Sequence, residues 1–176
     1  MNNILYTDTD IEARVKELGA LITENYCDSS RPLLVIGVLN GSFMFLSDLV
    51  KCLNLACKIE FVKISSYIDN KQTDNLKILY HNLDNYNLKD YNILIVEDII
   101  DTGCTMNQFV DYLINTFNLC ETDIKICTLL YKEFKNKTSL KPDYVGFYLK
   151  KDYFVVGYGM DNCDLDRNLS YIYTLN

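Results

Sequence analysis

The sequence is poor in the residues that interrupt regular structure or mark disordered and fibrous chains. Its 176 residues include only seven glycines and two prolines, while 49% are hydrophobic and 23% are charged. This balance is typical of a globular protein, so neither a disordered chain nor a fibrous repeat is indicated. The length suits one unit with a large buried core, and we expect residues 1–176 to form a single domain.

Basic residues are fewer than acidic ones. There are 17 lysines and arginines against 24 aspartates and glutamates, which gives a net charge of −7. Non-specific binding to nucleic acid depends on clustered basic side chains that neutralise phosphates, so we expect no nucleic-acid partner. A small anionic substrate is compatible with this charge, because backbone amides and Mg²⁺ supply a positive field locally.

Long apolar runs and paired cysteine motifs are also missing. No stretch reaches the roughly eighteen apolar residues of a membrane helix, and the first residues lack the basic-then-apolar pattern of a signal peptide. We therefore expect a cytoplasmic protein with no membrane partner. The seven cysteines include no Cys-x-x-Cys, which predicts reduced core residues rather than a disulfide framework or a zinc site. The only histidine, His81, lies in a polar connection and is predicted to be a surface residue.

One segment combines a buried strand with ligand-binding chemistry: residues 92–105 read Asn-Ile-Leu-Ile-Val-Glu-Asp-Ile-Ile-Asp-Thr-Gly-Cys-Thr. Residues 93–96 are apolar on both faces, as in a central parallel strand, and ligands bind at the carboxyl ends of such strands. Glu97, Asp98 and Asp101 follow, and then a turn with hydroxyls and a glycine opens a helix. Carboxylate oxygens beside backbone N–H groups predict a site for a phosphorylated sugar with Mg²⁺.

A purely structural interpretation accounts for single residues of this segment. Asp and Thr are good helix N-caps, and acids favour a helix N-terminus. It does not account for the whole string, because capping requires neither the buried strand nor three acids at this spacing.

The segment closely resembles the phosphoribosyl-diphosphate motif of type I phosphoribosyltransferases, and Glu-Asp-Ile-Ile-Asp-Thr-Gly is most similar to the 6-oxopurine, or hypoxanthine-guanine, branch. The resemblance implies that Asp101 is the catalytic general base. It also implies that Glu97 and Asp98 face the ribose hydroxyls and hold Mg²⁺. The residues that would bind the 5-phosphate of phosphoribosyl diphosphate are Thr102, Gly103, Cys104 and Thr105.

The resemblance extends over residues 35–167. Asn40-Gly41-Ser42, after an apolar strand, is similar to the loop that contacts pyrophosphate in the family, although Asn40 stands where Lys or Arg is usual. The resemblance implies that Arg167 also contacts pyrophosphate, where a planar fork suits phosphate oxygens. Asp161 is implied to help hold a second Mg²⁺ through water.

Three further residues are implied to bind the purine. Lys132 occupies the place of the lysine that contacts the 6-oxo group, Phe154 would stack on the base, and Val155 would read it through backbone groups. By pattern alone, a lysine after a strand indicates a surface charge, and the other two residues indicate ordinary strand core.

The polar span at residues 66–75 is predicted to be a mobile loop. Ser66 and Tyr67 resemble the head of the flexible catalytic loop of the family, which closes over the reacting groups and excludes water. The glycine usual in the later part of that loop is absent, because residues 73–76 read Thr-Asp-Asn-Leu.

The remaining pattern alternates strands and helices, which predicts an α/β fold with a mainly parallel, twisted sheet flanked by helices. The resemblance adds a small hood built from the chain ends and the flexible loop. Thr7 to Asp10 offer caps for a first amphipathic helix. The expected strands cover residues 33–39, 58–65, 76–80, 93–96, 124–130, 144–148 and 154–158, with a short segment at 171–173, and further helices cover 43–50 and 105–117.

The resemblance implies purine salvage: Mg²⁺-dependent transfer of the 5-phosphoribosyl group from phosphoribosyl diphosphate to hypoxanthine and/or guanine, giving IMP or GMP and pyrophosphate. Family members are usually dimers or tetramers, so a homodimer or homotetramer is expected. A xanthine-preferring enzyme and a non-catalytic phosphoribosyl-diphosphate sensor on the same fold remain alternatives. A Rossmann domain is set aside, because no Gly-x-Gly-x-x-Gly follows a strand.

Overall fold

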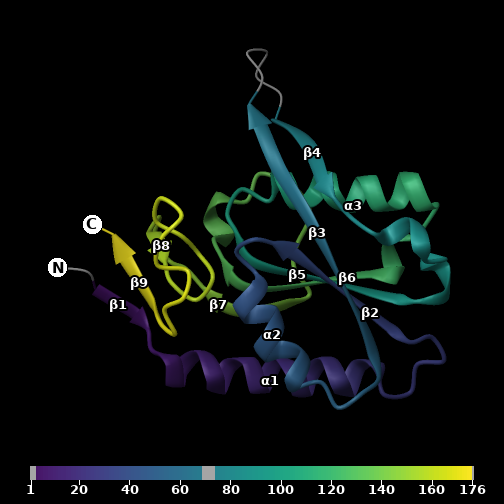
Figure 1. Ribbon diagram of the computed structural model, residues 1–176, viewed down its shortest axis with the longest axis horizontal. Helices are drawn as coiled ribbons and strands as arrows, with labels where there is room; N and C mark the ends of the chain where they lie inside the picture. The colour runs from purple at the N-terminus through teal and green to yellow at the C-terminus, as the bar shows by residue number, and fades with distance from the viewer. Residues whose placement is uncertain (1–2, 69–73, 176) are drawn as a thin grey trace.

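The computed structural model describes the backbone of residues 3–68 and 74–175 and the side chains of residues 3–65 and 76–175. Within these residues a six-stranded sheet, in the order β4-β3-β2-β5-β6-β7, carries helices on both faces (Figure 1). Neighbouring strands are parallel except β3 and β4. The predicted α/β fold is confirmed. The elements of the main sheet and its helices are α1 (Asp8–Tyr26), β2 (Leu33–Leu39), α2 (Phe43–Lys51), β3 (Cys57–Ile68), β4 (Asp74–Tyr80), β5 (Asn92–Ile100), α3 (Cys104–Phe117), β6 (Ile124–Tyr131) and β7 (Tyr144–Tyr148).

The first helix begins where the sequence predicts it. The Thr7 hydroxyl accepts the backbone N–H of Asp10 at 3.2 Å, and the Asp10 carboxylate accepts the backbone N–H of Thr7 at 2.9 Å, which completes a capping box. The apolar stripe of α1 is then buried against the sheet at residues Ile11, Val15, Leu18 and Ile22.

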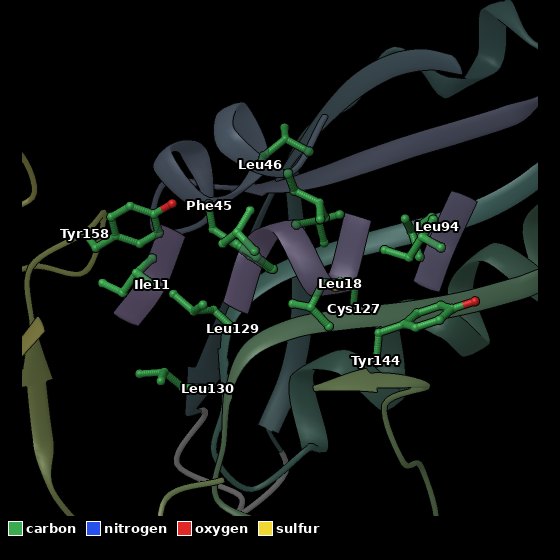
Figure 2. Close-up of a cluster of buried hydrophobic side chains, with 14 of the residues drawn as sticks. Ile11, Leu18, Phe45, Leu46, Leu94, Cys127, Leu129, Leu130, Tyr144 and Tyr158 are labelled. Atoms are coloured by element: carbon green, nitrogen blue, oxygen red, sulfur yellow. The ribbon is translucent and has the colours of Figure 1, made fainter. Parts of the chain in front are cut away.

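Two hydrophobic clusters lie on the two faces of the sheet. α1 and α2 cover one face, where Leu94 and Val96 of β5 point, and Figure 2 shows this cluster around Phe45 and Leu129. α3 covers the other face, where Ile93 and Ile95 of β5 point. Alternate residues of β5 thus enter opposite clusters, as expected of a central strand.

A second, three-stranded antiparallel sheet joins the two ends of the chain. Its order is β1 (Asn3–Tyr6), β9 (Ile172–Leu175) and β8 (Phe154–Val156), and both termini lie beside it in Figure 1. This sheet is the predicted hood. The Tyr6 ring stacks on the Phe147 ring of β7 with centroids 4.0 Å apart, which ties the hood to the main sheet.

The boundaries of several elements differ from the prediction. β5 does not stop at residue 96, because its pairing with β6 continues to Ile100, so Glu97 and Asp98 belong to the strand. The predicted loop at 66–75 is shorter, because β3 continues to Ile68 and β4 begins at Asp74, and residues 69–73 lie outside the described part of the chain. This hairpin extends the main sheet rather than the hood. β1 was not expected.

Two residue-level expectations were wrong. His81 is half-buried rather than a surface residue: its Nδ1 accepts the backbone N–H of Leu83 at 3.3 Å, and its Nε2 lies 3.0 Å from the Tyr112 hydroxyl. Among the cysteines only Cys127 is buried, and those exposed to solvent are Cys27, Cys120 and Cys163. Among the described residues, no helix is both long enough and apolar enough to cross a membrane.

Candidate active site

The site lies where the order of the parallel strands changes direction. β2 is flanked by β3 on one side and β5 on the other. The chain leaves β2 into α2 and leaves β5 into α3, and these helices cover opposite faces of the sheet (Figure 1). The two strands therefore lead to opposite faces of the sheet, and the edge at their carboxyl ends, called the crevice from here on, is the usual place for a ligand in such a sheet.

Glu97 and Asp98 lie at this edge of the sheet, and their side chains contact different neighbouring segments. Glu97 lines a small cavity with residues of α3, whereas Asp98 meets Gly41 of the loop after β2. Burial raises the pKa of Glu97 well above its ordinary value, and the negative charge of Asp98 raises it further. A cation bound beside Glu97 would favour its ionised form.

The predicted phosphate turn connects β5 to α3. Gly103 adopts a left-handed conformation at φ 77° and is the N-cap of α3. A cavity of about 120 Å³ lies at this turn. Besides apolar neighbours, its lining includes Glu97, Asp101, Thr102, Gly103 and Thr105. Cys104 is the first residue of α3 and is partly exposed. The structure thus brings hydroxyls and the start of a helix to one small hollow, a suitable arrangement for a phosphate.

The segment after β6 closes over this turn. The backbone N–H of Lys137 donates to the Thr102 carbonyl at 2.9 Å. A Cβ on Gly103 would lie 2.6 Å from Asn136 Oδ1 and 2.9 Å from Thr138 Oγ1, so glycine is needed for this close approach. The phosphate turn and the segment that carries Lys132 are therefore held together.

The predicted pyrophosphate loop packs against both β5 and the turn at residues 157–160. A Cβ on Gly41 would lie 1.9 Å from Asp98 Oδ2, and a Cβ on Gly159 would lie 1.9 Å from the Gly41 carbonyl oxygen. The peptide bond between Leu39 and Asn40 is cis, and Asn40 is exposed. Three segments distant in sequence thus meet at the Gly41 backbone, which contacts the Asp98 side chain and the Gly159 backbone.

Arg167 and Asp161 lie beside the turn at residues 157–160. Arg167 donates to the Gly159 carbonyl at 2.8 Å and forms an ion pair with Asp161 at 2.7 Å. The Asp161 carboxylate also accepts the backbone N–H of Asp164 at 2.9 Å. Two residues predicted to act on pyrophosphate and its metal are therefore paired with each other beside the loop that carries Gly41.

Lys132 is bound by two carboxylates. Its Nζ lies 3.0 Å from Asp101 and 2.7 Å from Asp152, and the residue is only 5% exposed. The prediction by pattern alone of a surface charge is wrong, because the side chain turns inward to these acids. The ammonium of Lys132 and then that of Lys135 hold the pKa of Asp152 below its usual range.

The two other residues predicted to bind the purine lie on β8. Val155 is buried and pairs with Thr174, whereas the Phe154 ring is 59% exposed. An exposed ring of this kind is free to stack on a flat ligand. The side chains of Ser66 and Tyr67, predicted for the flexible loop, lie outside the described residues.

Sequence reasoning gave no role to Lys135 or Asp152. Lys135 Nζ lies 3.0 Å from Asp101 and 3.0 Å from Asp152, so two lysines and two aspartates form one cluster, named here the purine-end charge cluster. Lys132 and Lys135 are separated by a single 3₁₀ turn, η4 (Glu133–Lys135), which places residues three apart on one side. The Lys-x-x-Lys spacing directly after a strand was the feature of the sequence from which this cluster could have been predicted.

The donor set at Glu97 and Asp98 fits Mg²⁺. Among the described side chains, neither acid has an ion pair with a lysine or arginine, and no three acidic, histidine or cysteine side chains gather as metal ligands. Mg²⁺ characteristically uses one or two carboxylates together with water and substrate phosphates, so two adjacent carboxyls suit it.

Comparison with known proteins assigns the chain to a family. A family model described as "Phosphoribosyl transferase domain" matches residues 2–162. A hypoxanthine phosphoribosyltransferase from Haemophilus influenzae is 42% identical over 172 residues, which is 97% of this chain and 93% of that protein.

Solved structures agree. A hypoxanthine phosphoribosyltransferase from Staphylococcus aureus superposes with a TM-score of 0.87 at 37% identity, covering 99% of this chain and 91% of that one. A hypoxanthine-guanine phosphoribosyltransferase from Bacillus anthracis, with a HEPES molecule in its active site, has a TM-score of 0.86 at 32% identity and covers 99% and 98%. Together with the crevice, the phosphate turn and the adjacent acids, these matches show that the chain belongs to the phosphoribosyltransferase family.

Proposed function

We propose that this chain transfers the 5-phosphoribosyl group of phosphoribosyl diphosphate to hypoxanthine and/or guanine in purine salvage, with Mg²⁺ as its cofactor. The carrying observation is the ion pair between Asp101, which directly precedes the phosphate turn, and Lys132, the residue proposed to bind the base. This contact brings the proposed general base beside the lysine proposed to bind the purine. The similarity to hypoxanthine and hypoxanthine-guanine phosphoribosyltransferases supports these substrates.

The reaction joins a purine ring nitrogen to the anomeric carbon of the sugar. As that bond forms, the bond from this carbon to the pyrophosphate oxygen breaks, and pyrophosphate leaves with the electron pair. The proton of the purine nitrogen passes to Asp101, which acts as the general base. Glu97 and Asp98 would hold Mg²⁺, which neutralises charge on the diphosphate.

The other site residues bind and orient. The turn from Thr102 to Thr105 offers backbone N–H groups and hydroxyls to the 5-phosphate. Gly41 and Arg167 lie on the pyrophosphate side, where backbone N–H and guanidinium groups suit phosphate oxygens. Asp161 is proposed to reach a second Mg²⁺ through water once Arg167 turns to pyrophosphate.

The purine is oriented by three side chains or backbone groups. Lys132 donates to the 6-oxo oxygen, Phe154 stacks on the ring, and Val155 reads the base through its backbone. An amino group at position 6 cannot accept this hydrogen bond, and an unpaired buried donor costs roughly 1–3 kcal/mol, so adenine is rejected. Ser66 and Tyr67 are proposed to head the loop that excludes water.

Broader features of the chain are also proposals. We propose that residues 1–176 act as one domain, because the hood and the main sheet share the crevice through Asp152 and Lys132. We further propose a cytoplasmic homodimer or homotetramer. Light scattering of the purified protein measures the oligomeric state.

The test is nucleotide formation from phosphoribosyl diphosphate with hypoxanthine, guanine, xanthine and adenine, with and without Mg²⁺. We expect Mg²⁺-dependent turnover of hypoxanthine or guanine and none of adenine. Preference for xanthine would instead identify a xanthine enzyme. Saturable binding of phosphoribosyl diphosphate without turnover of any base would indicate the non-catalytic sensor.

A further inference from the structure

The purine-end charge cluster contains one cation more than the single lysine that contacts the 6-oxo group. Lys132 and Lys135 each contact both Asp101 and Asp152, at distances between 2.7 and 3.0 Å. The two positive and two negative groups balance. Lys132 is nearly buried, whereas the Lys135 side chain is 30% exposed and approaches from the solvent side.

This arrangement sets a requirement for substrate binding. The Lys132 ammonium has three N–H donors, and in the structure it is engaged by both carboxylates. To donate to the purine, Lys132 has to turn from Asp101. If Lys132 were the only cation here, that movement would leave Asp101, whose side chain is 38% exposed, without a positive partner, which is unfavourable.

Lys135 is placed to remove this penalty. Its ammonium also contacts Asp101 and Asp152, so both acids keep a positive neighbour when Lys132 moves. Its backbone N–H donates to the Lys132 carbonyl at 2.9 Å, and the next turn is fixed because Lys137 N–H donates to Thr102 O at 2.9 Å. Lys135 is therefore carried on a held turn, not on a free loop.

We propose that Lys135 is a positioning residue of the purine subsite: it stays paired with Asp152 and Asp101 so that Lys132 turns to the 6-oxo oxygen without leaving either acid unpaired. This proposal rests on the proposed function. Lys135 itself touches neither the base nor the sugar. Its effect is specific to ligands with an oxygen at position 6, because only these draw Lys132 away from the cluster.

The first experiment is steady-state kinetics of Lys135→Met, which keeps the length of the side chain and removes its charge. We expect the KM for hypoxanthine to rise about tenfold, the scale of one charge-assisted hydrogen bond, while the KM for phosphoribosyl diphosphate stays unchanged. Lys135→Arg keeps the charge and should restore most of the lost affinity. The matched control is Lys125→Met, because Lys125 lies at the other end of β6 and pairs with Asp143 at 2.7 Å.

The second experiment measures binding of two nucleotides by calorimetry. Lys135→Met should bind IMP about tenfold more weakly but bind purine riboside 5′-monophosphate, which lacks the 6-oxo group, as tightly as the parent protein. Wild-type kinetics and IMP affinity in Lys135→Met would overturn the proposal, and so would an equal loss for both nucleotides, which indicates a structural role. Lys135→Gln replaces the methionine variant if the latter does not fold.

The two levels of proposal fail separately. Absence of turnover with every base in the parent protein would overturn the proposed function alone, because the comparison of the two nucleotides is a binding measurement. Normal turnover in the parent protein with no selective effect of Lys135→Met would overturn the role of Lys135 and leave the proposed function in place.

Discussion

Glu97 illustrates, at the scale of one residue, why this site favours a cation. Its carboxyl lies at the carboxyl end of β5, where partial burial and then the charge of Asp98 raise its pKa. Keeping the Glu97 carboxyl ionised is costly without a nearby positive charge. Lys132 and Lys135 form their ion pairs with Asp101 and Asp152, not with Glu97 or Asp98. A bound Mg²⁺ is the complement that we propose for Glu97 and Asp98.

Asp101→Asn tests the proposed general base. Asn keeps the size of the side chain but cannot take the purine proton, so turnover should fall by about 10²–10⁴ while the KM for phosphoribosyl diphosphate changes little. Steady-state kinetics measure both constants. Asp143→Asn is the control, because Asp143 also pairs with a lysine but lies at the far end of β6. Unchanged turnover in Asp101→Asn would remove Asp101 from the mechanism.

At the scale of elements, the crevice depends on backbone contacts between turns. The loop after β2, the end of β5 and the turn at 157–160 pack so closely that only glycine fits at Gly41 and Gly159. Gly159 also has φ 101°, a conformation that L side chains rarely adopt. The side of the site proposed to bind pyrophosphate is therefore shaped by backbone packing as well as by side chains.

Gly159→Ala tests this packing. The new Cβ would lie 1.9 Å from the Gly41 carbonyl oxygen and would be strained at positive φ, so the free energy of unfolding should fall by about 2–4 kcal/mol and the KM for phosphoribosyl diphosphate should rise. Gly37→Ala should cost less, because its Cβ would meet chiefly the terminal methyl of Leu46, which is flexible. Urea unfolding compares the two. A smaller cost at Gly159 than at Gly37 would contradict the role of this contact.

At the scale of the whole molecule, the site lies between two sheets. The main sheet contributes the acids, the phosphate turn and Lys132, while Asp152 leads into β8 of the hood. The hood is joined to β7 by the stacked rings of Tyr6 and Phe147. A ligand that contacts both sheets binds the folded chain only, so binding should stabilise the whole molecule.

Thermal unfolding with Mg²⁺ and phosphoribosyl diphosphate measures this linkage. At a ligand concentration one hundred times its Kd, the folded state gains about 2.7 kcal/mol, or roughly 5–10 °C in Tm for a chain of this size. Removal of Mg²⁺ with EDTA should abolish most of the shift. Glu97→Gln should also reduce it, whereas Lys125→Met should not. A full shift in the presence of EDTA would show that the metal does not take part in binding.

The sequence alone determined the elements and the chemistry of the central segment. Periodicity and capping predicted α1, α3 and the buried strands, because burial of one face imposes a local pattern. The motif from Glu97 to Thr105 predicted the acids and the phosphate turn as one site, because ligands meet such strand ends in a short stretch of chain, and Glu97, Asp101 and Thr105 do line one cavity. The short strands β1 and β9 carried a weaker signal, since each is only four residues long and they pair with each other from opposite ends of the chain.

Only the tertiary structure decided how the parts of the site meet. Lys132 and Asp152 are 20 residues apart, and Lys135 joins them from a turn whose sequence indicates surface charge. The contacts of Gly41 with Asp98 and of Gly159 with Gly41 likewise connect separate loops. The physical reason is that electrostatic pairing and close packing depend on distance in space, whereas the sequence pattern records only which face each residue presents.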